Sequence, residues 1–149
     1  MKLNISEIMK ILKHRYPLLL IDTVTFVEPM VSCTAHKNFT YNEWFFPAHF
    51  PKNPIVPGSL QIEAYTQAVG ITLLANQNKE EKYSSDLLLV SIDRMRFYKP
   101  VRPGDTLDIQ VKVEKVAMGM ATAQACGFVG ATLASECKIG YKLDWENNG

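Results

Sequence analysis

A short segment of the sequence combines residue types that could move a proton next to a carbonyl group. His49 lies in a proline-rich loop, FFPAHFPKNPIVPGS, and because the proline ring nearly fixes φ, such a loop should hold the imidazole still. The unperturbed pKa of histidine, about 6.5, makes His49 a candidate general base. The backbone N–H groups of Gly58 and Ser59, at the start of a predicted helix, could donate hydrogen bonds to an oxygen on which negative charge develops.

Glu63 supplies the second ionisable group of this segment. It shares one face of the predicted helix with Ser59 and Gln67, at positions i, i+4 and i+8, a polar line that could also be the solvent edge of the helix. Burial raises the pKa of a carboxyl group, so a neutral Glu63 could donate a proton to a leaving hydroxyl. Together with His49 this favours β-elimination of water, although hydrolysis by an activated water would use the same groups.

The apolar pattern predicts the elements that position these groups. The run from Ser59 to Asn76 is apolar around most of its circumference, which is typical of a buried helix. A shorter amphipathic helix is predicted over residues 5–12, with Ser6 as its cap. Two strands are predicted over residues 18–27 and 31–40, and four more in the second half of the chain: LLLVSIDRMRFYKP, DTLDIQVKVEKV, MATAQACGFVG and TLASECKIGYKL.

These elements predict one compact α+β unit. About six strands with short connections, and therefore mostly antiparallel, would wrap around the long central helix. The chain of 149 residues is near the commonest domain size, so residues 1–149 are expected to form a single domain. The polar run from Asn76 to Asp86 is expected to be a solvated loop or the frayed end of the helix.

Composition and charge argue against several functional classes. The net charge of +1 gives no general attraction for nucleic acid, and no segment has the roughly 20 consecutive apolar residues that a membrane span needs. The N-terminus lacks the pattern of a signal peptide, so we expect a cytoplasmic protein. Cys33, Cys126 and Cys137 lack metal or redox spacing and should be reduced core residues. Three scattered histidines offer no metal-ligand spacing, so no metal is expected.

A small basic cluster lies around the end of one predicted strand. It could dock an acidic partner, or it could be an ordinary solvated strand edge. Its members are Arg94, Arg96, Lys99 and Arg102.

The segments LKHRYPLLLID, FFPAHFPKNPIVPGSLQIEAYTQA and RFYKPVRPGD resemble the β-hydroxyacyl-acyl carrier protein dehydratases of the FabA/FabZ type, in order and over nearly the whole chain. The resemblance implies a hot-dog fold, in which a curved sheet wraps one long helix, and a homodimer that could assemble further into a trimer of dimers. It also implies that His49 is the base, that the partner subunit's Glu63 is the acid, and that the Gly58 N–H donates to the thioester carbonyl.

The same resemblance implies the substrate. It would be a 3-hydroxyacyl chain on the phosphopantetheine arm of acyl carrier protein, converted to a trans-2-enoyl thioester in fatty-acid or related acyl-chain synthesis, without metal or organic cofactor. Glutamate rather than aspartate at position 63 favours the FabZ-like branch, and an acidic carrier adds weight to the basic cluster as a docking site. Phe50, Val56, Phe97 and Tyr98 become candidates for the wall of the acyl tunnel.

Several residues depart from the family pattern. Lys52 replaces a usual glycine, Val56 a methionine, Ser59 a hydrophobic residue or cysteine, and Tyr65 a methionine; Lys13 replaces a proline. None removes a catalytic group, but three of them flank the presumed site, so acyl chain length and pathway stay open. A hot-dog thioesterase and a non-catalytic acyl-binding subunit are the alternative functions.

Overall fold

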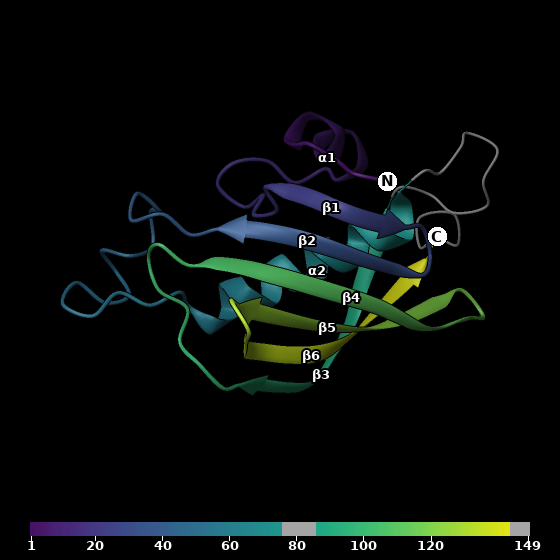
Figure 1. The fold of residues 1–149 in the computed structure, drawn as a ribbon. Coiled ribbons are helices and arrows are strands. Elements are labelled where there is room, and N and C mark those ends of the chain that lie inside the picture. Colours follow the sequence, from purple (N-terminus) through teal and green to yellow (C-terminus); the bar gives the residue numbers. More distant parts are fainter. Residues whose placement is uncertain (76–85, 144–149) are drawn as a thin grey trace.

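In the computed structural model, which describes residues 1–75 and 86–143, a curved antiparallel sheet wraps around one long helix (Figure 1). The helix, α2, spans Gly58–Leu74. Over the described residues the sheet has six strands in the order β1-β2-β4-β5-β6-β3, and all neighbours are antiparallel. This confirms the predicted α+β hot-dog architecture. The strands are β1 (Thr23–Glu28), β2 (Ser32–Asn38), β3 (Leu87–Phe97), β4 (Thr106–Ala117), β5 (Met120–Val129) and β6 (Thr132–Leu143).

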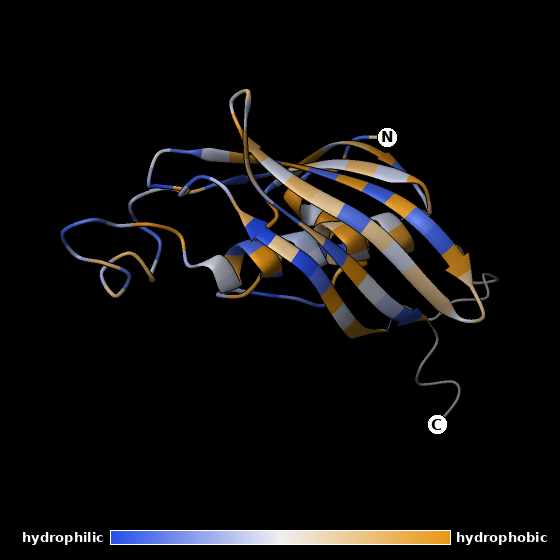
Figure 2. Cartoon of the chain, turned by 90° about the horizontal axis from the view of Figure 1, so that it is seen from below, coloured by the Kyte–Doolittle hydropathy of each residue, from blue (hydrophilic) through white to orange (hydrophobic). Residues whose placement is uncertain are grey.

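The concave face of the sheet buries α2. Hydrophilic and hydrophobic residues alternate along the strands (Figure 2), so that one face of the sheet packs on the helix and the other meets solvent. On β5 the inward positions are Ala121, Ala123 and Ala125, which are almost without exposure. These small side chains leave room for large ones from the helix, including Tyr65 and Ile71, both fully buried. The predicted long buried helix is therefore confirmed, from one residue earlier than expected.

The short N-terminal helix, α1, spans Ile5–Ile11. Its cap is Asn4 and not the predicted Ser6. The Asn4 side chain accepts from the N–H of Glu7 at 3.0 Å, and the Glu7 carboxylate accepts from the N–H of Asn4 at 2.7 Å. This reciprocal pair satisfies two backbone donors at once, which explains why the helix begins before Ser6.

β1 is shorter than predicted, because the backbone of Leu18 and Leu20 bonds to a side chain of α2. The N–H of Leu20 donates to Oε1 of Gln67 at 2.8 Å, and Nε2 of Gln67 donates to the carbonyl of Leu18 at 2.7 Å. These backbone groups are satisfied by a side chain, so regular pairing starts only at Thr23. The predicted polar loop over residues 76–86 lies, apart from Asp86, outside the described residues.

All three cysteines are free thiols. Cys33 and Cys137 are buried core residues, as predicted, whereas Cys126 is only half-buried. Burial raises the pKa of Cys33 to about 11 and that of Cys137 to about 12. Both buried thiols are therefore protonated and unreactive at neutral pH.

Candidate active site

His49 is fixed by the backbone of its own loop, the segment between β2 and α2 that extends away from the sheet at the left of Figure 1. Its Nδ1 lies 3.1 Å from the carbonyl oxygen of Ile55, and the N–H of Ile55 donates to the carbonyl of His49 at 3.0 Å. Because a carbonyl oxygen can only accept, Nδ1 carries the proton and Nε2 of the neutral ring keeps its lone pair. The Phe50 ring stacks on the imidazole, with centroids 4.2 Å apart. His49 is thus held with Nε2 as its basic nitrogen.

The start of α2 has open backbone donors beside this loop. Pro57 is the N-cap residue and makes no side-chain capping bond, and the first N–H groups of a helix have no partner within it. A Cβ atom on Gly58 would lie 2.6 Å from Cζ of Phe97. Only glycine therefore lets this ring lie so close to the helix start, where the N–H groups of Gly58 and Ser59 begin α2.

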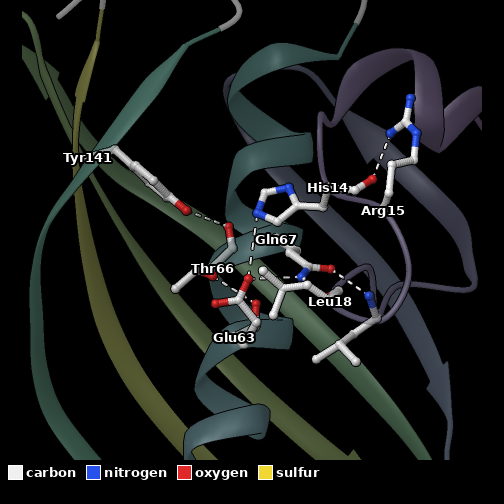
Figure 3. Close-up of polar contacts among 8 residues, drawn as sticks. His14, Arg15, Leu18, Glu63, Thr66, Gln67 and Tyr141 are labelled. Atoms are coloured by element: carbon white, nitrogen blue, oxygen red, sulfur yellow. Dashed lines mark hydrogen bonds and ion pairs between the residues drawn. The ribbon is translucent and has the colours of Figure 1, made fainter.

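Glu63 lies further along α2 in a network of polar contacts (Figure 3). Nε2 of Gln67 donates to Oε1 of Glu63 at 3.0 Å, and the same amide holds the backbone of Leu18 and Leu20. Gln67 is fully buried, so the polar line of the helix is not its solvent edge, although Ser59 is exposed. The Glu63 side chain is 26% exposed in the single chain, which is less burial than the sequence suggested.

His14 lies beside Glu63, a contact that the sequence did not reveal. Its Nε2 lies 3.6 Å from Oε1 of Glu63 (Figure 3), and its Nδ1 is buried with no hydrogen-bond partner among residues 1–75 and 86–143. His14 follows α1, far from Glu63 in sequence, so no local pattern reports the contact. Its presence in the segment LKHRYP, one of the three that carry the family resemblance, was the available signal.

Hydrogen bonds attach the turn that carries Glu63 to β6. The Thr66 hydroxyl donates to the carbonyl of Glu63 at 2.8 Å, and the Tyr141 hydroxyl donates to the carbonyl of Thr66 at 2.9 Å. Burial raises the pKa of Tyr141 to about 12. The phenol is therefore protonated, and a donor, at neutral pH.

Two cavities flank α2. One of about 270 Å³ opens beside Glu63, with His14 and Tyr141 in its wall, and one of about 340 Å³ opens beside Gly58. His49 lines neither cavity, and no hydrogen bond or ion pair between described residues joins His49 to Glu63. Within one chain the two candidate proton-transfer groups are therefore not paired.

Three of the four predicted tunnel residues come together. Val56, Phe97 and Tyr98 line the cavity beside Gly58, with Ile55, Gln61, Lys99 and Pro100. Phe50 instead stacks on His49 and is 52% exposed.

The predicted docking residues divide into two groups. Arg94 and Arg96 line a surface hollow of about 360 Å³ that Lys138 also lines. Lys99 lies at the cavity beside Gly58, and Arg102 donates from Nη1 to Oδ1 of Asn53 at 2.6 Å. The basic cluster of the sequence is therefore divided, and the hollow that holds Arg94 and Arg96 also has Glu114 and Glu136 in its wall.

Comparison with known families gives a match over most of the chain. Residues 12–138 match the model of the FabA-like domain. The chain is 40% identical over 139 residues to the 3-hydroxyacyl-acyl-carrier-protein dehydratase FabZ of Wolbachia sp. subsp. Brugia malayi, covering 93% of this chain and 95% of the relative. It is 44% identical over 137 residues to the protein of that name from Nitrosospira multiformis, covering 92% and 94%.

Solved structures show the same fold. The dehydratase heterocomplex ApeI:P from Xenorhabdus doucetiae contains a chain that superposes with a TM-score of 0.75 at 17% identity, covering 91% of this chain and 90% of that one. An uncharacterized protein from Pyrococcus horikoshii superposes with a TM-score of 0.66 at 12% identity, with 86% of each chain covered. Among the residues that the structure describes, no helix has the length and apolar character to cross a membrane.

Proposed function

The chain belongs to the FabA-like domain family, and we propose that His49 and Glu63 carry out its reaction as a base and an acid from different protomers. The reaction is the removal of water from 3-hydroxyacyl-acyl carrier protein, which gives the trans-2-enoyl thioester. The FabZ dehydratases of Wolbachia and Nitrosospira support this activity at 40% and 44% identity over more than nine-tenths of the chain.

The first step is removal of a proton from C2 of the thioester by Nε2 of His49. The bond from Nδ1 to the carbonyl of Ile55 supports this role, because it leaves Nε2 as the basic nitrogen. Negative charge then develops on the thioester oxygen, and the N–H of Gly58 at the helix start donates a hydrogen bond to that oxygen. Ser59, the next residue of α2, contributes the second open donor.

The second step is departure of the C3 hydroxyl. The C3–O bond breaks as the C2–C3 double bond forms, and protonated Glu63 gives its proton to the leaving oxygen, so that water departs. Gln67 donates to Oε1 of Glu63, which leaves Oε2 to carry the proton. Before the next turnover His49 releases its proton to solvent, and Glu63 takes up a proton from solvent.

The separation of the two groups supports a composite site in a homodimer. His49 and Glu63 are not paired within one chain, so the acid would come from the partner. The edge strand β3 supports this arrangement, because it exposes a row of apolar side chains: Leu88, Leu89, Val90, Ile92 and Phe97 are between 38% and 52% exposed. An exposed apolar edge strand is a template for pairing with a second strand. β3 of one protomer would pair with β3 of the other.

Elimination fits these groups better than the two alternatives. A thioesterase would need only a carboxylate and an oxyanion donor, and a binding subunit would need neither proton-transfer group. The fixed tautomer of His49 and the amide that holds Glu63 support proton transfer by both groups. The cytoplasm, where acyl carrier protein occurs, is the proposed location.

The direct test supplies the protein with 3-hydroxyacyl-acyl carrier protein and follows the enoyl product by mass spectrometry. Wild type should form it, and His49→Ala and the isosteric Glu63→Gln should each lower the rate by at least about 100-fold. Release of free thiol without enoyl product would indicate the thioesterase. No product from wild type, or full activity in both variants, would refute the proposal.

A further inference from the structure

A chain of buried polar side chains connects the core to the cavity beside Gly58. The Tyr65 hydroxyl contacts Oγ of Ser135, and the Ser135 hydroxyl lies 2.7 Å from Oε1 of Gln61. Tyr65 and Ser135 are fully buried, and Gln61 is 3% exposed. Burying uncharged polar groups costs stability unless each is hydrogen-bonded, and here the three side chains bond to one another.

The order of donors fixes the orientation of the Gln61 amide. The one hydroxyl proton of Ser135 is donated to Oε1 of Gln61, so the Tyr65 hydroxyl must donate to Ser135 in turn. Oε1 is thereby directed inward. The amide group at the other end, Nε2, has no hydrogen-bond partner among the described residues and is not sealed within the protein. Gln61 lines the cavity beside Gly58, so we infer that Nε2 is the end of its amide that faces the cavity.

The residues around this series of hydrogen bonds leave room for it. A Cβ atom on Gly127 of β5 would lie 2.1 Å from the Tyr65 hydroxyl oxygen, so glycine at this position makes room for the phenol. Tyr65 stands where the family pattern has methionine, which could not donate to Ser135. α2, β5 and β6 thus each contribute a residue to holding one amide in one orientation.

The rest of the cavity is mainly apolar, with Ile55, Val56, Phe97 and Pro100 in its wall, and among the described residues Lys99 is its one charged lining residue. Tyr98 also lines it, but its hydroxyl donates to Glu136 at 2.8 Å. Gln61 follows Gly58 by three residues, which places it on the same side of α2 and roughly 4.5 Å further along the axis. If the thioester carbonyl binds at Gly58 as proposed, the donors of Gln61 lie a few carbon–carbon bonds further along the acyl chain.

We propose that Gln61 determines substrate specificity by donating from Nε2 to an oxygen atom in the acyl chain beyond C3. The preferred substrates are then 3-hydroxyacyl thioesters whose chains carry a hydroxyl, keto or ether oxygen, and plain alkyl chains are poorer substrates. This inference rests on the proposed dehydratase activity and on the cavity beside Gly58 as the acyl site. Gln61 binds substrate, whereas Tyr65 and Ser135 are positioning residues.

The physical reason is the free-energy cost of excluding water from the amide of Gln61. An alkyl chain in the cavity would exclude water from Nε2 and leave its donors unpaired, whereas a chain with an acceptor oxygen would satisfy one of them. A site that must hydrogen-bond its substrate discriminates more strongly than a purely apolar one. The expected preference, in kcat/KM, is about 10- to 100-fold.

The experiment compares acyl-carrier-protein substrates of equal length. In each, one methylene at the fifth, sixth or seventh chain position is replaced by an ether oxygen, and the all-carbon chain is the reference. Wild type should prefer at least one oxygen-containing chain by about tenfold or more. Gln61→Leu should abolish that preference and improve turnover of the all-carbon chain. Tyr65→Phe, which keeps the ring but frees Ser135, should weaken the preference.

The ratio of kcat/KM values within one variant does not depend on how much of the protein is folded, so partial misfolding does not obscure the result. Val56→Ala is the matched control: it alters the volume of the same cavity and should leave the oxygen preference unchanged. If wild type eliminates water from all chains equally well, or if Gln61→Leu keeps the preference, the role of Gln61 is refuted. If wild type forms no enoyl product from any chain, the dehydratase itself is refuted.

One other source of the acceptor oxygen is the amide carbonyl of the carrier arm. In that case Gln61→Leu would slow all acyl chains alike, and the effect would disappear with thioesters that lack the arm's amide. This result would also overturn the proposal, because selection among acyl chains would then be absent.

Discussion

Gln67 fixes the carboxyl group of Glu63 to the loop that precedes β1. Its Nε2 lies 3.0 Å from Oε1 of Glu63 and 2.7 Å from the carbonyl of Leu18, and its Oε1 accepts from the N–H of Leu20. One buried side chain therefore orients the proposed acid and also holds a segment far away in sequence.

Replacing Gln67 should affect both stability and turnover. Gln67→Leu removes the partners of the Leu18 carbonyl and of the buried Leu20 N–H, which should lower the free energy of unfolding by about 2 kcal/mol or more. Glu63 is also released from its position, so kcat should fall about tenfold or more. Urea denaturation and steady-state kinetics measure the two effects. Gln110→Leu, the same change at an exposed site on β4, should leave both nearly unchanged; equal effects at the two sites would contradict this role.

Gly127→Ala tests the space that the Tyr65 hydroxyl needs. The added methyl group would lie 2.1 Å from that oxygen and 2.7 Å from Cδ1 of Leu107, so it should destabilise the fold by about 1–3 kcal/mol. In a Tyr65→Phe background the nearest clash is gone, and the cost of Gly127→Ala should be smaller. A double-mutant cycle from thermal or chemical unfolding measures this coupling. Strictly additive costs would show that the two residues do not interact.

The buried thiol of Cys33 makes stability depend on pH in the alkaline range. Burial raises its pKa from 9.0 to about 11, an effect that a hydrogen bond with Thr72 partly offsets. The folded state therefore holds this proton more tightly than the unfolded state, and the stabilisation, at most about 3 kcal/mol, is complete below pH 9.0 and lost as pH rises towards about 11. Urea unfolding across this range should show a shallower decline for Cys33→Ala than for wild type. An identical decline in both proteins would contradict the assignment.

Arg96 lies in the surface hollow that Arg94 and Lys138 also line, and charge reversal there tests carrier docking. Arg96→Glu should raise KM for the carrier-protein substrate by about tenfold, because an acidic partner is then repelled. KM for a small thioester without the carrier should not change. Lys112→Glu, at another exposed position of the sheet, is the matched control. An equal loss with both kinds of substrate would mean that Arg96 does not dock the carrier.

The helices and strands could be predicted from the sequence because their signals are local. The apolar circumference of α2 and the alternation along β4 depend on residues a few positions apart, and both elements are found as expected. The cap of α1 was misassigned to Ser6, since Asn4 and Glu7 together satisfy more donors than Ser6 could. The start of β1 was placed too early because its backbone partners come from Gln67, almost fifty residues later in the chain.

In the candidate site, too, only the relationships between residues close in sequence could be predicted. The types and order of His49, Gly58 and Glu63 already indicated elimination, since one loop and one helix carry all three. His14 beside Glu63, and the chain from Tyr65 through Ser135 to Gln61, depend on which distant elements meet in space. In the sequence Tyr65 was visible only as an unexplained departure from methionine, because its partner Ser135 lies on β6.

The most direct test of the composite site mixes two inactive variants. His49→Ala and Glu63→Gln are unfolded and refolded together, or coexpressed with different tags, and the elimination rate is measured on 3-hydroxyacyl-acyl carrier protein. If dimers form at random, half are heterodimers with one intact His49–Glu63 pair, so about a quarter of the wild-type activity should return. Heterodimers that form, as shown by recovery of both tags, but remain inactive would contradict a site shared between protomers.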